Sequence, residues 1–428
     1  CYYSGIPEEE ATRRTIMRYY KRKNPMLVRE MIRNVYKECK GVPKGNCLTK
    51  EQRLSLQMDE FMNRRYEFRY NTQIGEVEYR ERFSFQFYFH PIDKRAQNSI
   101  MLDAQSEGIG VWDRDIDRYL HSNRVPIYNP LEEFLFHLPH WDGKDRIHAL
   151  ANRVPCNNPH WELLFHRWFL NMVSHWRGVD KMHANSTSPI LVGAQGTHKS
   201  TFCREMIPPA LRAYYTDSID FSQKRDAELY LNRFALINID EFDQITLTQQ
   251  GFLKHILQKP VVNLRKPHGR SVLELQRYAS FIGTSNQKDL LTDPSGSRRF
   301  ICIEVTGNID TTQPIDYEQL YAQAMHEIYH GERYWFDSED EQIMTENNRE
   351  FEQTPAMLQL FYQYFKAAQT KEEGEFLTPV EILNYLKKKS GISLSDNKVY
   401  HFGRLLQKCG ITSKHTYKGT VYQVIKVS

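Results

Sequence analysis

Four short, mostly apolar runs in the second half of the chain predict buried β-strands. They are Ile190–Val192, Phe234–Ile239, Tyr278–Gly283 and Ile301–Val305. Apolar runs of this length are typical of strands that are covered on both faces. Helical segments are expected at 201–206 and 252–257, and the region after residue 309 is mostly helical in pattern. We therefore expect an α/β domain over residues 185–353.

The first 124 residues predict a separate α+β domain. A helical pattern runs over residues 8–40, with a break at Asn24-Pro25. Thr49 and Gln52 form a capping box for a second helix that ends near Arg65. The segments 66–70 and 76–80 flank a turn and predict a hairpin.

Two features of this N-terminal domain allow two interpretations each. Phe83, Phe85, Phe87 and Phe89 alternate with other residues, which favours one strand with a buried face; a base-stacking platform is the alternative. The first helix is rich in arginine and lysine, which favours a solvated helix face over a nucleic-acid-binding arm.

A helical lead-in is expected over residues 125–184. Asn129-Pro130 and Asn158-Pro159 each start a helix, because asparagine is a good N-cap and proline suits the first helical position. The second of these helices has an apolar stripe that we expect to be core, formed by Trp161, Leu164, Trp168 and Met172.

Residues 354–428 predict a small domain of three helices and two strands that resembles a winged helix. The helices are expected at 357–368, 378–389 and from Ser395 to Gly410, and the strands at 411–416 and 420–426. The third helix has a predicted buried stripe of Val399, Phe402, Leu406 and Cys409. His401, Arg404 and Lys408 then lie on its other side, as a DNA recognition helix requires. A protein-docking role is the alternative.

Composition limits the class of protein. The chain has 428 residues, of which 40% are hydrophobic and 26% charged, as in ordinary globular proteins. It has no apolar run long enough to span a membrane. Seven scattered cysteines without C-x-x-C pairs argue against a zinc module and for a reducing, cytoplasmic location. Since the net charge is only +4, any basic surface must be local. The chain begins at Cys1 instead of methionine, and we expect a fragment of a longer protein.

A glycine-rich segment follows the first predicted strand. Its candidate nucleotide-binding residues are Gly193, Gln195, Gly196, Thr197, His198, Lys199, Ser200 and Thr201. The segment resembles the phosphate-binding loop of P-loop NTPases, with His198 in the place of the last glycine. In such a loop backbone N–H groups surround the phosphates, the lysine reaches the β and γ oxygens, and the hydroxyl is a Mg²⁺ ligand. We therefore expect ATP and Mg²⁺ as ligands.

Polar residues follow the later strands. Asp240, after the second strand, is a candidate Mg²⁺ ligand together with Ser200, and Glu241 is a candidate for orienting the attacking water. Asn286, after the third strand, is placed to contact the γ-phosphate or that water. One of Arg298 and Arg299 is expected to be an arginine finger, and the other a surface ion pair.

These motifs, in this order, resemble the virulence-associated E family of phage and mobile-element proteins. The resemblance rests on Gly193–Ser200, Asn238–Phe242, Thr284–Asn286, Asp293–Phe300, Trp141-Asp142-Gly143 and Tyr128-Asn129-Pro130. The family is similar to superfamily 3 helicases and poxvirus-type primase-helicases. It implies an AAA+-like P-loop ATPase fold and a DNA helicase or translocase of DNA replication.

The same resemblance implies that the chain forms a ring, expected to be a hexamer, which acts on single-stranded or forked DNA. A primase is a further expected partner. A predicted hairpin around Pro267-His268-Gly269 would face the ring's channel, with the candidate DNA-binding residues Arg265, Lys266, His268 and Arg270. Two rivals stay open. One is a P-loop kinase of a small substrate, and the other is a nucleotide switch or scaffold in which His198 prevents turnover.

Overall fold

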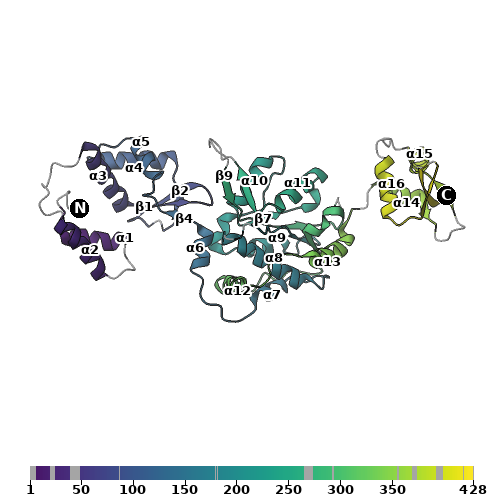
Figure 1. The fold of residues 1–428 in the computed structure, drawn as a ribbon, viewed down its shortest axis with the longest axis horizontal. Helices are drawn as coiled ribbons and strands as arrows, with labels where there is room; N and C mark the ends of the chain where they lie inside the picture. The colour runs from purple at the N-terminus through teal and green to yellow at the C-terminus, as the bar shows by residue number, and fades with distance from the viewer. Residues whose placement is uncertain are drawn as a thin grey trace. The chain divides into compact units, whose positions relative to one another are not determined.

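The computed structural model describes residues 6–19, 25–38, 49–85, 87–178, 180, 182–264, 273–291, 294–353, 356–368, 374–391, 399–417 and 419–427. The chain divides into two compact units, Cys1–Glu133 and Phe134–Ser428, which are described separately (Figure 1). None of the described helices is long and apolar enough to cross a membrane.

In its described residues the N-terminal unit combines a small sheet with five helices. The helices are α1 (Glu8–Tyr19), α2 (Pro25–Glu38), α3 (Lys50–Arg65), α4 (Lys94–Ser106) and α5 (Asp113–Leu120). The strands are β1 (Tyr66–Asn71), β2 (Glu76–Glu81), β3 (His90–Pro91) and β4 (Ile127–Tyr128), in the order β3-β2-β1-β4. The Thr49–Gln52 capping box and the antiparallel β1–β2 hairpin are as predicted. A core that includes Phe61, Tyr66 and Phe68 joins α3, α4 and α5 to the sheet.

The predicted strand over Phe83–Phe89 is wrong. This segment connects β2 to β3, which pair with each other at Glu78 and Tyr79, and its described residues, 83–85 and 87–89, belong to no strand. Without a ladder the alternating side chains have no sheet face to bury, and Phe83, Phe85 and Phe87 are exposed.

The second unit is built on a five-stranded parallel sheet in the order β11-β5-β10-β7-β6. The strands are β5 (Ser188–Val192), β6 (Tyr215–Thr216), β7 (Leu236–Ile239), β10 (Ser280–Ser285) and β11 (Phe300–Glu304). β5, β7 and β10 are buried throughout, as their apolar runs predict. The fold of this unit is therefore mixed α/β.

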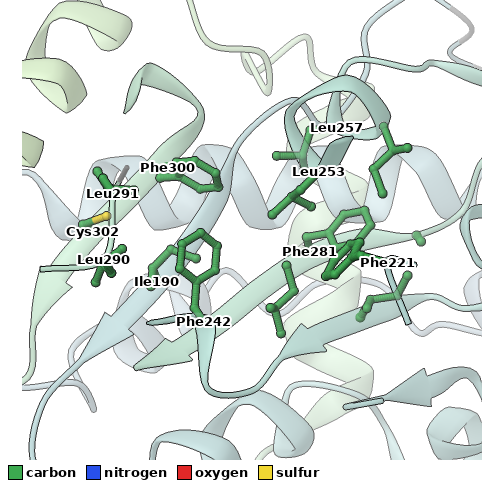
Figure 2. Packing of buried hydrophobic residues seen from close by; sticks show 14 of the residues in the cluster. Ile190, Phe221, Phe242, Leu253, Leu257, Phe281, Leu290, Leu291, Phe300 and Cys302 are labelled. Atoms are coloured by element: carbon green, nitrogen blue, oxygen red, sulfur yellow. The ribbon is translucent and has the colours of Figure 1, made fainter. Parts of the chain in front are cut away.

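One hydrophobic cluster packs against this sheet (Figure 2). Phe242 and Phe300 meet edge to face, with ring centroids 5.2 Å apart. Leu253 and Leu257 of α11 (Leu247–Leu257) join the same cluster as Phe281 of β10. Because strands and helix share one core, the carboxyl ends of β5, β7 and β10 are fixed relative to one another.

Helices surround the sheet (Figure 1). They are α6 (Pro130–Phe136), α7 (Arg146–Ala151), α8 (Trp161–Trp176), α9 (Lys199–Glu205), α10 (Lys224–Arg233), α12 (Tyr317–Tyr329) and α13 (Ser338–Asn348). Short 3-10 turns occupy Pro209–Tyr214, Phe242–Gln244, Pro294–Arg299 and Arg349–Phe351. The predicted stripe of α8 is fully buried, and Trp176 stacks on Tyr321 of α12 at 5.1 Å.

A buried arginine joins a two-stranded hairpin to the main sheet. The hairpin pairs β8 (Val261–Leu264) with β9 (Leu273–Gln276), and Arg277 follows it directly. The Arg277 guanidinium donates to Leu257 O and Lys259 O, both at 2.7 Å, and to Asn185 O at 3.0 Å. Burial lowers the pKa of Arg277. Carbonyl groups at the C-terminal end of α11 compensate its charge.

The described part of the C-terminal segment forms three helices and a small sheet. The helices are α14 (Ala356–Tyr364), α15 (Pro379–Ser390) and α16 (Val399–Lys408). The strands are β12 (Phe365–Ala367), β13 (Glu375–Leu377), β14 (Ser413–Thr416) and β15 (Gly419–Lys426), and the other three all pair with β15.

Two predictions for this segment need correction. The helix predicted to reach Ala368 ends at Tyr364, because residues 365–367 pair with β15 instead. Cys409 is exposed although Phe402 and Leu406 are fully buried. It lies one residue beyond the end of α16 at Lys408, so helical spacing no longer places it on the buried face.

Candidate active site at the ends of the parallel strands

The loop between β5 and α9 has a backbone that needs its glycines. A Cβ at Gly193 would lie 2.9 Å from Val305 O, and Gly196 has φ +86°. His198 also adopts a left-handed conformation, with φ +66°, at the N-cap of α9. Histidine tolerates this region better than bulkier residues do, so the loop keeps a glycine-like path at this position.

Lys199 folds back into this loop. Its Nζ donates to Gly193 O at 2.8 Å and Ala194 O at 2.7 Å, and it lies 3.4 Å from Thr197 Oγ1 and 3.2 Å from Asn286 Oδ1. Lys199 is buried, and this burial lowers its pKa, while the negative charge of Asp240 opposes the shift. A partly desolvated ammonium is thus held in the concave side of the loop.

Asp240 lies immediately after β7, beside the first turn of α9. Ser200 Oγ donates to Asp240 Oδ1 at 3.1 Å, and the Thr284 hydroxyl of β10 donates to the same oxygen. Both Ser200 and Asp240 are exposed, and oxygen ligands of these two types suit Mg²⁺. The pair that the sequence predicts as metal ligands is therefore brought together.

Glu241 is exposed next to Asp240 and has φ +53°. Within the described residues, His198 and Glu241 are the non-glycine residues with positive φ. Such backbone strain concentrates at functional sites. A cavity of about 180 Å³ borders this turn and is lined by Ile239, Asp240, Glu241 and Gln249, among others. The carboxylates thus face open space.

The polar end of β10 supplies residues that sequence reasoning missed. Besides Thr284, Ser285 donates through its hydroxyl to Asp243 Oδ1 at 2.7 Å. The signal is the polar sequence Thr284-Ser285-Asn286 after an apolar strand, of which the sequence analysis predicts only Asn286 as a site residue. Asn286 itself contacts Lys199, as described above.

The remaining candidates form none of the hydrogen bonds given above or lie outside the described residues. Arg298 is exposed and forms an ion pair with Glu341 of α13 at 2.8 Å, and Arg299 is half-buried beside it. Gln195 and Thr201 are exposed on the loop and on α9. Arg265, Lys266, His268 and Arg270 lie outside the described residues. On α16, which contains His401, Arg404 and Lys408, the described Arg404 side chain is exposed.

Fold and site together define a mixed α/β protein with a lysine, a carboxylate pair and short polar side chains at the carboxyl edge of a parallel sheet. Residues 135–353 match the virulence-associated protein E-like domain. This match spans more than half of the chain, so the chain belongs to that family. Residues 354–424 match DUF3874, a domain of unknown function described from a B. Theta gene.

Solved structures add two similarities. An apo structure of the NrS-1 C-terminal region has a TM-score of 0.44 and 12% identity, covering 89% of this chain and 100% of that chain. The A form of the same region has a TM-score of 0.43 and 11% identity, covering 88% and 99%. No curated protein matches the chain in sequence.

Proposed function

We propose that the chain is a P-loop ATPase of the superfamily 3 type that moves or unwinds DNA during replication of a phage or mobile element. One observation carries the proposal: Lys199, Asp240 and Asn286 come from the ends of three adjacent parallel strands and form one connected cluster. β5 lies between β10 and β11 in the sheet. Open α/β sheets bind ligands outside the carboxyl ends of their parallel strands.

The residues present fit a nucleotide triphosphate. Backbone N–H groups at the start of α9 provide donors for phosphate oxygens. Lys199 holds the β and γ phosphates when its ammonium exchanges the carbonyls of Gly193 and Ala194 for phosphate oxygens. That exchange is favourable because a charged acceptor replaces neutral ones around a partly desolvated cation.

The hydroxyl of Ser200 and the carboxylate of Asp240 would hold Mg²⁺, which neutralises developing charge on the phosphates. Thr284 orients Asp240, and Glu241 orients and deprotonates the attacking water. Asn286 keeps Lys199 in place and contacts the γ-phosphate or the water.

A neighbouring copy in a ring completes the site in this proposal. In this proposal Arg299 supplies the transition-state charge, and Arg298 forms the surface ion pair with Glu341. Arg265, Lys266, His268 and Arg270, which lie in the sequence between β8 and β9 and outside the described residues, are proposed to bind DNA phosphates in the channel. The C-terminal segment, a winged-helix-like arrangement with β14–β15 as its wing, adds contacts from His401, Arg404 and Lys408.

The test is steady-state phosphate release from ATP by the full chain, measured across a Mg²⁺ titration with and without single-stranded DNA, together with unwinding of a forked duplex. We expect Mg²⁺-dependent hydrolysis that DNA stimulates. Asp240→Asn should raise the Mg²⁺ concentration required by about tenfold or more, because the metal loses a charged ligand. The matched control Asp226→Asn, at an exposed position on α10 outside both proposed sites, should change nothing. Phosphoryl transfer to a small acceptor, or nucleotide binding without turnover, would contradict the proposal.

A further inference from the structure

The connection between β2 and β3 exposes four aromatic rings within six residues. The exposed fractions are 88% for Phe83, 95% for Phe85, 72% for Phe87 and 79% for Tyr88. A single exposed aromatic residue needs no explanation, but a cluster of them marks an interaction site. The aromatic loop, as we call residues 83–88, lies in the N-terminal unit, which the family match does not cover.

Side chains of the sheet hold the base of the aromatic loop. Arg80 Nη1 donates to Phe87 O at 3.0 Å, and Arg82 Nε donates to Asn63 O at 2.8 Å. The guanidinium groups of Arg69 and Arg80 lie 3.9 Å and 4.7 Å from the ring centroid of Phe89. The loop is therefore anchored at both ends, while its outer rings stay in solvent.

Positive charge is available close by in the chain. Lys94 and Arg95 follow β3 at the start of α4, and both are exposed. Lys94 also lines an open cavity of about 730 Å³ with Arg114 and Trp112, and the cavity is lined by Asp113 and Asp117 as well. Trp112 is 62% exposed. Among the residues that the structure describes, Lys94, Arg95 and Arg114 take no ion pair.

We propose that the aromatic loop is a stacking site for single-stranded nucleic acid, with Lys94, Arg95 and Arg114 near the phosphates. The apolar side chains of the loop are all aromatic, with no leucine, isoleucine, valine or methionine among them. Every base has a π-face, so such rings bind single strands without reading sequence, and adjacent cations attract the backbone. At the base of the loop Glu67 forms ion pairs with Arg80 and Arg82, which offset the charge of this carboxylate.

This site lies in a different unit from the proposed ATPase site, and binding there requires no nucleotide. The two proposals therefore fail separately. If the chain hydrolyses no ATP but loses DNA affinity when the loop is changed, the ATPase proposal falls and this one stands. If ATP hydrolysis is intact and the loop variants bind DNA normally, the reverse holds.

The experiment measures binding of a fluorescein-labelled oligo-dT of about 20 nucleotides to the full chain without nucleotide, by anisotropy. Phe85→Ala/Phe87→Ala should weaken binding by about tenfold or more, because stacking contributes about 1–3 kcal/mol per base. It should leave the slope of log Kd against log salt unchanged, since no phosphate contact is lost. Lys94→Glu/Arg114→Glu should reduce that slope by about 1–2. The matched control Phe136→Ala removes a ring that is 77% exposed elsewhere and should have no effect.

Photo-crosslinking of the same oligo-dT locates the contact. Crosslinked mass should appear on the tryptic peptide of residues 83–94 in the wild-type chain. Unchanged affinity of the Phe85→Ala/Phe87→Ala variant, with crosslinks only elsewhere, overturns the proposal. A wild-type dimer in light scattering that this variant dissociates, with unchanged affinity per protomer, assigns the loop to a second copy. A lowered melting temperature with unchanged affinity assigns it to packing within the chain. Both results also overturn the proposal.

Discussion

The loop after β5 and the aromatic loop after β2 differ in how much their side chains contact the rest of the chain. In the loop after β5, Lys199 contacts two carbonyls, a hydroxyl and an amide within the same unit. In the aromatic loop after β2, the rings of Phe83, Phe85 and Phe87 remain in solvent. The lysine at the end of the first loop has hydrogen-bond partners within its own unit, while the aromatic rings of the second loop are exposed to solvent.

The difference explains where sequence reasoning works. The spacing of Gly193, Gly196 and Lys199 encodes a backbone path whose requirements are local, so the loop can be predicted from the residues that form it. Alternating aromatics predict a buried strand face only if a partner strand exists, and that condition is not local. The sequence of residues 83–89 does not indicate that β3 is the strand that pairs with β2.

The largest expected effect is that of Lys199→Ala, which should reduce ATP hydrolysis but leave DNA binding without nucleotide unchanged. Lys199→Ala should reduce ATP hydrolysis by about 1000-fold or more, since the phosphates lose a preorganised cation in a partly desolvated site. Its affinity for oligo-dT without nucleotide should match that of the wild type. The measurements are phosphate release and anisotropy, with the exposed Lys50→Ala as the control for both. If Lys199→Ala lost ATP hydrolysis and oligo-dT affinity to the same extent, the two loops would not have separate functions.

A second prediction concerns whether the proposed ATPase site needs a residue from a neighbouring copy of the chain. Arg299→Ala should bind ATP normally and hydrolyse it about 100-fold more slowly or worse, because an arginine finger stabilises only the transition state. Mixing this variant with Lys199→Ala should restore part of the activity, since some interfaces then combine an intact Lys199 with an intact Arg299. The activity of the mixture is compared with that of each variant alone. Absence of rescue, with a chain that stays monomeric with ATP and DNA, would refute the ring.

The smallest expected effect concerns the backbone at His198. His198→Gly should leave ATP hydrolysis within about tenfold of wild type, a barrier change of about 1.4 kcal/mol at most, because glycine adopts φ +66° without strain. His198→Val should be the poorer variant, since a β-branched residue disfavours positive φ. Turnover rates of the two variants test this. Loss of activity in the glycine variant would show that the imidazole itself takes part in the reaction.

The candidate site was predicted in outline and missed in detail. Lys199, Ser200, Asp240 and Asn286 are brought together because they follow strands that share one parallel edge. Thr284, Ser285 and Asp243 were missed because hydrogen bonds between neighbouring strand ends depend on strand order, which no spacing records. The three-residue strands β12 and β13 were missed for a similar reason. They are defined by pairing with β15 and have no pattern of their own.

The most direct test of the account is Glu241→Gln, measured as ATP affinity and turnover on the same preparation. Glutamine keeps the size and polarity of the side chain but cannot accept the proton of the attacking water. We predict wild-type affinity for ATP and a turnover at least about 100-fold lower, while the control Glu350→Gln behaves as wild type. Normal turnover in Glu241→Gln would contradict the assignment of this carboxylate, and with it the catalytic site at the ends of β5, β7 and β10.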